Sequence, residues 1–314
     1  MRMAVQPRGR PPDRPDREKR SEILAYIAKQ GPAIGLPTLR QRFPDVAKGE
    51  LIETQWRFRR VWKKRRSLLR HVLQWEKPGT VWAMDHGHSP LPLDGQYGSF
   101  LAVRDLAAQY QLAAMPVPDQ TARMTKAVLN GFVKVYGAPL VIKSDNGSGF
   151  RSEEVKAWAR EHDILMLYSP GRTPEYNGAI EAGIGNLKVR AEHQAIANGR
   201  PGNWTCDDLQ GAVMQGNEQN RPWGLNGPTP EAVRPQRQTI TPEERNSFLD
   251  SYWRYHDEER RSRDHQVDVA LNHFEQASID RIAIRQALVE GGYLTFRRKR
   301  IAPPFSSKNA DIFS

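Results

Sequence analysis

The pattern of apolar residues between positions 81 and 197 constrains the fold more than any other feature of this sequence. Three strand-like runs, VWAMD, SFLAVRD and YQLAAMPV, follow one another closely and predict an antiparallel meander. Helical spacing over 121–136 is then followed by the run PLVIKSD, a helix over 153–162, the run ILMLY and a helix that contains Glu181. The order βββαβαβα predicts an α/β domain with a mixed five-stranded sheet flanked by helices.

The segments on either side of this region have different patterns. Residues 1–20 mix Pro, Arg and Asp without periodicity, so we expect a disordered basic arm. Over 21–76 the spacing predicts three helices in an all-α helix-turn-helix domain, the third running from about Ala47 to Gln74. We expect the central domain to span 80–236 and a mostly helical region of unknown role to span 240–314.

Positive charge is concentrated at one end of the chain. The net charge is +11, and residues 1–80 hold 20 Lys and Arg against 8 Asp and Glu, whereas residues 81–314 hold 27 against 28. Such a field favours binding of a polyanion, because each neutralised phosphate releases counterions. A solvated basic surface without a partner is the alternative.

The third predicted helix of the amino-terminal domain carries most of the predicted DNA contacts. A phosphate-binding surface is expected there, although three-helix modules also serve as plain structural bundles. The residues are Arg57, Arg59, Arg60, Lys63, Lys64, Arg65 and Arg66.

Composition excludes several classes of protein. The sequence has no apolar run of about 18 residues that would span a bilayer and no amino-terminal secretory signal, so we expect a cytoplasmic protein without membrane partners. Cys206 is the only cysteine, which excludes internal disulfides and any zinc site with two thiolates from this chain.

Three carboxylates occur at the ends of predicted elements. Asp85 ends the first strand, Asp145 ends the fourth, and Glu181 lies on the last helix of the core. Strands one and four are neighbours in such a sheet, so the three side chains are expected at one edge. Unit charges 4 Å apart repel by about 4 kcal/mol at an effective dielectric near 20, so a cation is needed between them. Oxygen ligands favour Mg²⁺ or Mn²⁺, and two ions would suit phosphoryl transfer.

These carboxylates and their spacing resemble the D,D-35-E core of retroviral-integrase-type DDE transposases. Thirty-five residues separate Asp145 from Glu181, SDNGSGF surrounds Asp145, and SPGRTPEYNGAIE leads to Glu181. The resemblance covers roughly Trp82 to Pro235. It implies an RNase H-like fold that cuts DNA at element ends and joins the freed 3′ hydroxyls to target DNA, without a covalent protein intermediate.

The resemblance also implies further partners and residues. Lys188, two helical turns after Glu181, matches a basic position that holds the DNA end in the family; an ordinary exposed lysine is the alternative. At least a homodimer is implied, because two DNA ends are joined. The chain lacks the cysteines of the zinc-binding module of retroviral integrases, which points to a bacterial insertion element and a nucleoid-associated protein.

Several alternatives remain open from the residues alone. A nuclease or resolvase of the same fold would use the same metals without strand transfer, and a domesticated copy would bind DNA without catalysis. His86 and His88, beside the first carboxylate, are metal ligands in one interpretation and polar loop residues in the other. Gly183 and Gly185 are expected to let DNA or the sheet approach the helix of Glu181.

Overall fold

The computed structural model describes residues 15–171, 174–236, 239–263 and 271–301 of the 314-residue chain. It divides into two compact units, one formed by Met1–Val72 with Arg297–Ser314 and the other by Leu73–Phe296. Residues 1–14 of the predicted disordered arm lie outside the described residues; for its last four residues the prediction is wrong, because the first helix begins at Arg17. No helix among the described residues is long and apolar enough to cross a membrane.

The described part of the first unit is a small helical bundle, as predicted. Its helices are α1 (Arg17–Gln30), α2 (Leu36–Arg42) and α3 (Lys48–Arg66). The Asp16 side chain caps α1 by accepting a hydrogen bond from the Lys19 N–H at 2.7 Å. The bundle buries a compact apolar core, made of Ile23, Ile27, Leu39, Phe43 and Leu51.

The prediction of one helix continuing to Gln74 is wrong. Helix α3 ends at Arg66, and Leu68–Trp75 forms strand β1, which pairs with β7 (Leu294–Ile301) in a two-stranded sheet. Beyond β1 the Glu76 N–H donates to the Tyr293 carbonyl at 3.0 Å. The partner strand lies more than 200 residues away in the sequence, so a local pattern could not reveal it.

The second unit is built on the predicted five-stranded sheet. Its strand order is β4-β3-β2-β5-β6. Antiparallel pairing joins β2 to β3 and β3 to β4, whereas β5 is parallel to β2 and to β6. This is the RNase H-like arrangement expected from the sequence. The strands are β2 (Val81–Leu93), β3 (Tyr97–Asp105), β4 (Tyr110–Val117), β5 (Val141–Ser144) and β6 (Leu165–Tyr168).

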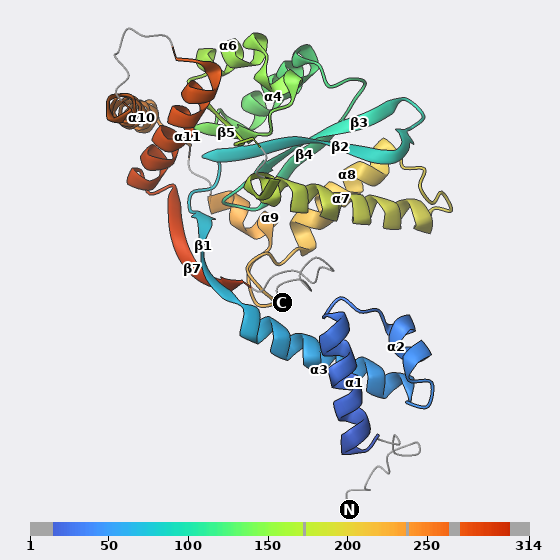
Figure 1. The fold of residues 1–314 in the computed structure, drawn as a ribbon. Coiled ribbons are helices and arrows are strands. Elements are labelled where there is room, and N and C mark those ends of the chain that lie inside the picture. Colours follow the sequence, from blue (N-terminus) through green and yellow to red (C-terminus); the bar gives the residue numbers. More distant parts are fainter. Residues whose placement is uncertain (1–14, 172–173, 237–238, 264–270, 302–314) are drawn as a thin grey trace, which may run out of the picture. The chain divides into compact units, whose positions relative to one another are not determined.

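Helices cover both faces of this sheet (Figure 1). Because strand side chains alternate between the faces, Val81 and Ala83 belong to the apolar core beneath α7, whereas Trp82 and Met84 belong to the core beneath α4 and α6. The helices are α4 (Ala122–Tyr136), α5 (Ser148–Arg151), α6 (Glu153–Glu161), η1 (Pro174–Asn177), α7 (Gly178–Ala197), α8 (Cys206–Gln219), α9 (Pro230–Val233) and η2 (Arg234–Gln236).

A helical hairpin, α10 (Pro242–Ser262) and α11 (His273–Glu290), completes the second unit. The Arg245 guanidinium anchors α10 to the sheet domain by donating to the carbonyls of Ala138 (2.7 Å), Pro139 (2.9 Å) and Asp163 (2.8 Å). Ile284 and Leu288 of α11 are buried in the same core as Leu167 of β6. The predicted helical region, up to Phe296, therefore belongs to the same compact unit as the sheet.

Asp105 at the end of β3 holds the turn that follows it. The side chain is buried and accepts from the backbone N–H groups of Gly79 (2.5 Å), Ala107 (2.9 Å) and Ala108 (3.1 Å). We expect Asp105→Ala to lower the free energy of unfolding by about 2–4 kcal/mol, since buried donors lose a charged acceptor. Urea denaturation measures the change, and Asp250→Ala, exposed on α10, should stay within about 0.5 kcal/mol of wild type.

Candidate active site

Asp85 of β2 and Asp145, the residue that follows β5, lie level with each other on neighbouring segments of the sheet. The parallel ladder of β2 and β5 pairs Val81 with Val141 and Ala83 with Lys143, and each aspartate lies two residues beyond the second of these pairs. Adjacent strands are about 4.8 Å apart, and residues in parallel register point to the same face. Both aspartates therefore lie at the same edge of the sheet, where the charge of Asp145 acts on Asp85.

The field around Asp85 includes all three predicted carboxylates. Burial, with smaller contributions from the charges of Asp145 and Glu181, raises the pKa of Asp85 to about 6, and the hydrogen bond from the His86 N–H (2.8 Å) acts in the opposite direction. The Asp145 carboxylate accepts from the Gly147 N–H at 2.9 Å, which fixes it at the start of the following turn. The site is thus an acidic cluster in which the charges of Asp145 and Glu181 disfavour ionisation of Asp85.

Glu181 lies exposed in the first turn of α7, and a buried lysine holds the chain just before it. Lys143 Nζ donates to the Tyr176 carbonyl and to Asn177 Oδ1 (3.3 Å), and it lies 4.1 Å from the centroid of the Tyr176 ring. Burial lowers the pKa of Lys143 to about 8, while the charge of Glu181 acts in the opposite direction. The lysine therefore connects β5 to the segment that carries Glu181.

A buried serine extends this connection. Ser169 Oγ lies 2.8 Å from Asn177 Oδ1 and 3.1 Å from the Ser144 carbonyl, and Asn146 Nδ2 donates to the Ser169 carbonyl at 2.8 Å. These contacts join the end of β5, the loop after β6 and the start of α7. The Ser-Pro and Asn-Gly pairs of the sequence motif thus have a structural role, which is to hold the third carboxylate near the first two.

Helix α7 also approaches the sheet closely at one glycine. A Cβ atom at Gly183 would lie 2.5 Å from Arg104 Nη1, and the same guanidinium donates to the Ala179 carbonyl at 3.4 Å. The predicted close approach to the sheet is confirmed at this position. Gly178 and Gly185 have no described atom within 4 Å of an added Cβ, so approach of DNA there stays a prediction.

The donor set suits a hard divalent cation. Mg²⁺ is commonly held by one or two protein carboxylates together with substrate phosphate and water, and Asp85 with Asp145 supplies such a pair. Among the described residues, no group of three or more His, Cys, Asp and Glu is arranged to hold a metal ion by itself. Glu181 acts on Asp85 more weakly than Asp145 does. The chain therefore offers two carboxylates at one point and a third nearby.

A cavity of about 210 Å³ opens beside the two aspartates. His86 forms one wall, stacked on Phe150 with ring centroids 4.7 Å apart, and burial lowers its pKa to about 4. His88 is exposed, with Nδ1 3.3 Å from the Gly98 carbonyl and Nε2 3.4 Å from Gln120 Nε2. Both imidazoles already have protein neighbours, which favours their interpretation as polar wall residues.

The predicted DNA-binding residues occupy two separate places. Lys188 is half-buried on α7, two turns beyond Glu181. In the helical bundle Arg59 donates to the carbonyls of Pro32 (2.8 Å) and Ile34 (3.0 Å), so it stabilises the bundle. Arg57 pairs with Glu53 at 2.5 Å, and the Arg60 guanidinium lies 5.4 Å from the centroid of the Trp56 ring. Lys63, Lys64 and Arg65 are exposed.

Comparison with known proteins agrees with this geometry. Residues 76–174 match the protein family described as "Integrase core domain". The region is an integrase-type core. The family match ends before Glu181, so it does not include the third predicted carboxylate.

Individual relatives of the integrase core come from retroviruses. Over 128 residues the chain is 33% identical to the Pro-Pol polyprotein of feline foamy virus; the match covers 41% of this chain and 11% of the polyprotein. The match to the catalytic core domain of BIV integrase covers 50% of this chain and 95% of the integrase chain, at 18% identity and a TM-score of 0.40. The match to a simian T-cell lymphotropic virus intasome in complex with PP2A regulatory subunit B56 gamma covers 71% of this chain and 76% of the intasome chain, at 15% identity and a TM-score of 0.45.

Proposed function

We propose that this chain is a transposase that cuts DNA at the ends of a mobile element and joins the freed 3′ hydroxyls to target DNA. The observation that carries the proposal is the level placement of Asp85 and Asp145 on β2 and β5 of an integrase core. Glu181 adds a third carboxylate within their electrostatic field. No serine or cysteine nucleophile is required, because the attacking group is water or a DNA hydroxyl.

The three carboxylates would hold Mg²⁺ or Mn²⁺, two ions per active site. When bound, the ions would activate the attacking water or 3′ hydroxyl and offset the charge that develops on the phosphate. Asp145 is oriented by the Gly147 N–H, and the Lys143–Asn177 contacts orient the segment before Glu181. The contribution of the protein is thus to position oxygen ligands and to line a cavity next to them.

A strand-transfer assay tests the proposal against its nearest alternative. Duplexes with the sequences that flank the coding region, either intact or with a pre-cut 3′ end, are incubated with a supercoiled plasmid and Mg²⁺ or Mn²⁺. We expect cleavage of the intact ends and covalent joining of the pre-cut ends to the plasmid. Cleavage without joining would favour a nuclease or resolvase; neither activity, with DNA binding retained, would favour a domesticated DNA-binding protein.

The basic end of α3 is proposed to grip the phosphate backbone of the element end. Lys64 and Arg65 are both exposed in its last turn. We expect Lys64→Gln combined with Arg65→Gln to reduce the slope of log Kd against log salt by roughly 2, since each phosphate contact contributes about 0.9. Fluorescence anisotropy between low and moderate salt measures the slope. An unchanged slope would show that Lys64 and Arg65 do not contact phosphate.

The same function implies a partner copy. Joining two ends in one reaction requires at least two active sites, so a homodimer or larger assembly on paired ends is proposed. Analytical ultracentrifugation of the protein with and without paired-end DNA checks this expectation; a monomer on each isolated end, active in transfer, would contradict it.

A further inference from the structure

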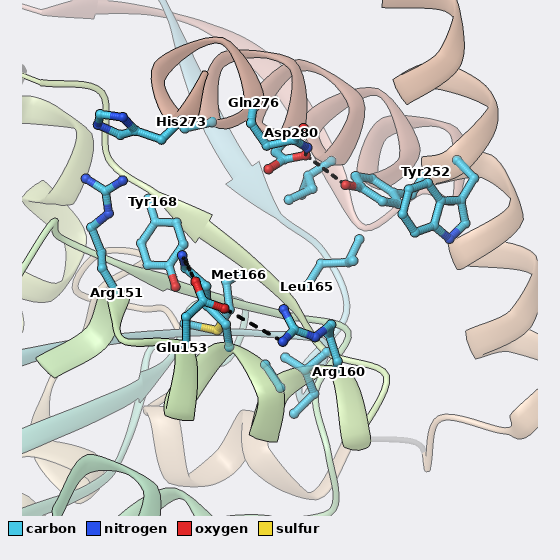
Figure 2. A pocket seen from close by; sticks show the side chains of 16 residues that line it. Arg151, Glu153, Arg160, Leu165, Met166, Tyr168, Tyr252, His273, Gln276 and Asp280 are labelled. Carbon is cyan, nitrogen blue, oxygen red and sulfur yellow. Dashed lines mark hydrogen bonds and ion pairs between the residues drawn. The ribbon is translucent and has the colours of Figure 1, made fainter. Parts of the chain in front are cut away.

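A second cavity lies between the sheet domain and the helical hairpin (Figure 2). Its volume is about 380 Å³, and α6 and β6 form one side while α10 and α11 form the other. None of the predicted active-site residues lines it. Its apolar floor includes Ile164, Leu165, Met166 and Ile284. The cavity therefore offers a separate binding site where the helical hairpin packs on the sheet domain, and we call it the hairpin pocket.

One wall of this hairpin pocket is cationic. Arg151, Lys156 and Arg160 line it together with Glu153. Glu153 forms ion pairs with Lys156 at 2.7 Å and with Arg160 at 3.8 Å. Among the described residues no carboxylate pairs with Arg151, whose guanidinium lies 5.7 Å from the centroid of the Tyr168 ring. This wall thus presents a cation beside an aromatic ring, which is a suitable place for a phosphate next to a base.

The opposite wall presents a carboxylate. Asp280 of α11 accepts hydrogen bonds from the Tyr252 hydroxyl (2.8 Å) and from Gln276 Nε2 (2.7 Å), both at Oδ1 (Figure 2). Within the described part of the chain Oδ2 accepts none, so it is available to a donor in the pocket. The Asp280 side chain is 26% exposed, and its partial burial raises its pKa. Trp253 also lines the pocket and is 54% exposed.

The pocket adjoins the acidic cluster through α5. Phe150 lines the cavity beside Asp85 and Asp145, its carbonyl accepts from the Tyr168 hydroxyl at 3.0 Å, and the next residue, Arg151, lines the hairpin pocket. Tyr168 also pairs in the sheet with the residue that precedes Asp145. A DNA strand that passes the two aspartates would therefore reach the hairpin pocket on the far side of α5.

We propose that the hairpin pocket takes one unpaired nucleotide of the DNA strand that passes the active site. Its phosphate lies against Arg151, its base against Tyr168, and an N–H group of the base donates to Asp280. The mixed lining favours a nucleotide over a purely apolar ligand or a simple anion, since the cation, the aromatic ring and the half-buried acceptor match its phosphate, its base and an N–H group of the base. The inference rests on the proposed action on DNA and adds to it a site for an extruded base.

Photo-cross-linking of the full chain tests this site. Duplexes with a four-nucleotide single-stranded overhang carry 5-iododeoxycytidine at each overhang position in turn, and binding is measured in EDTA so that no cleavage is needed. We expect one position to cross-link to the peptides that contain Tyr168, Trp253 or Asp280. Cross-links confined to peptides outside the pocket would overturn the proposal.

Affinity for the same overhang supplies a second measurement. Arg151→Gln is expected to weaken binding about tenfold, whereas Lys134→Gln, which removes an exposed charge from the last turn of α4, should leave it within about twofold. Asp280→Asn should reduce the preference for an overhang with an amino-bearing base over one with an abasic residue. Equal affinities of Arg151→Gln and Lys134→Gln for the overhang would also overturn the proposal.

The outcomes separate this site from the proposed function. If the protein cleaves and joins DNA but cross-links outside the hairpin pocket, the proposal of a nucleotide site in this pocket is wrong and the proposed transposase function stands. If it cross-links in the pocket but neither cleaves nor joins DNA, the nucleotide site stands and the proposed catalytic function is wrong.

Discussion

Asp145→Asn is expected to lower metal-dependent DNA cleavage by at least about 10³-fold. The residue lies level with Asp85 at the edge of the sheet, so its carboxylate is one of two that would hold the same cation. Losing about 4 kcal/mol of stabilisation in the transition state corresponds to this factor. DNA affinity measured in EDTA should change little, because the side chain serves the cation and not the phosphate directly.

Thermal stability gives a readout of Asp145→Asn that does not depend on activity. In wild type the charge of Asp145 helps to raise the pKa of Asp85, so the two carboxylates repel each other. The variant removes this repulsion, and its Tm without metal should equal or exceed that of wild type. Added Mg²⁺ should raise the Tm of wild type and leave that of the variant nearly constant, since ligand binding stabilises only the state that binds it.

Asp105→Asn is the matched control for this experiment. Asp105 is also an aspartate at the end of a core strand, but it is buried on backbone N–H groups and has no place in the acidic cluster. It should lose stability and keep the Mg²⁺-dependent rise of Tm. If Asp145→Asn cleaves DNA as wild type does, the assignment of the metal site to β2 and β5 is wrong.

Local sequence was sufficient for the parts of the fold that depend on local periodicity. The alternation in VWAMD and PLVIKSD places apolar side chains in the cores and brings Asp85 and Asp145 to the same edge, so both strands and the proximity of the two aspartates could be predicted. The left-handed conformations of Asp94 (φ 49°) and Gly95 (φ 70°) at the β2–β3 turn follow equally from the Asp-Gly pair.

Contacts between distant segments could not be predicted in this way. The local sequence predicts helix where strand β1 forms, because the partner strand β7 lies far along the chain. The hairpin pocket joins residues 151–168 to residues 252–284, and nothing in either segment alone indicates the other. Lys143 offered one signal, a lysine inside an otherwise apolar strand, but its partners in η1 became known only from the fold.

Lys143→Met is expected to lower the rate of cleavage about 10²-fold while leaving the protein folded. Lys143 is 5% exposed, and its ammonium group donates to the Tyr176 carbonyl and the Asn177 side chain just before α7. Without it, the segment before Glu181 can shift, and a displacement of about 1 Å in an active site can cost about this factor. Methionine fills a similar volume, but the Tyr176 carbonyl and Asn177 Oδ1 lose a buried donor, so the Tm should fall modestly.

The kinetic pattern separates positioning from direct contact with DNA. If Lys143 only orients the Glu181 segment, kcat falls and both KM and the affinity for DNA stay near wild type; a rise in KM with kcat unchanged would show that the lysine binds substrate. Ser169→Ala, which removes one contact to Asn177, should give a smaller loss, about tenfold. Lys134→Met, exposed on α4, should behave as wild type. If Lys143→Met keeps full activity at an unchanged Tm, the position of Glu181 is set by the packing of α7 alone, with Gly183 against Arg104 as its main contact.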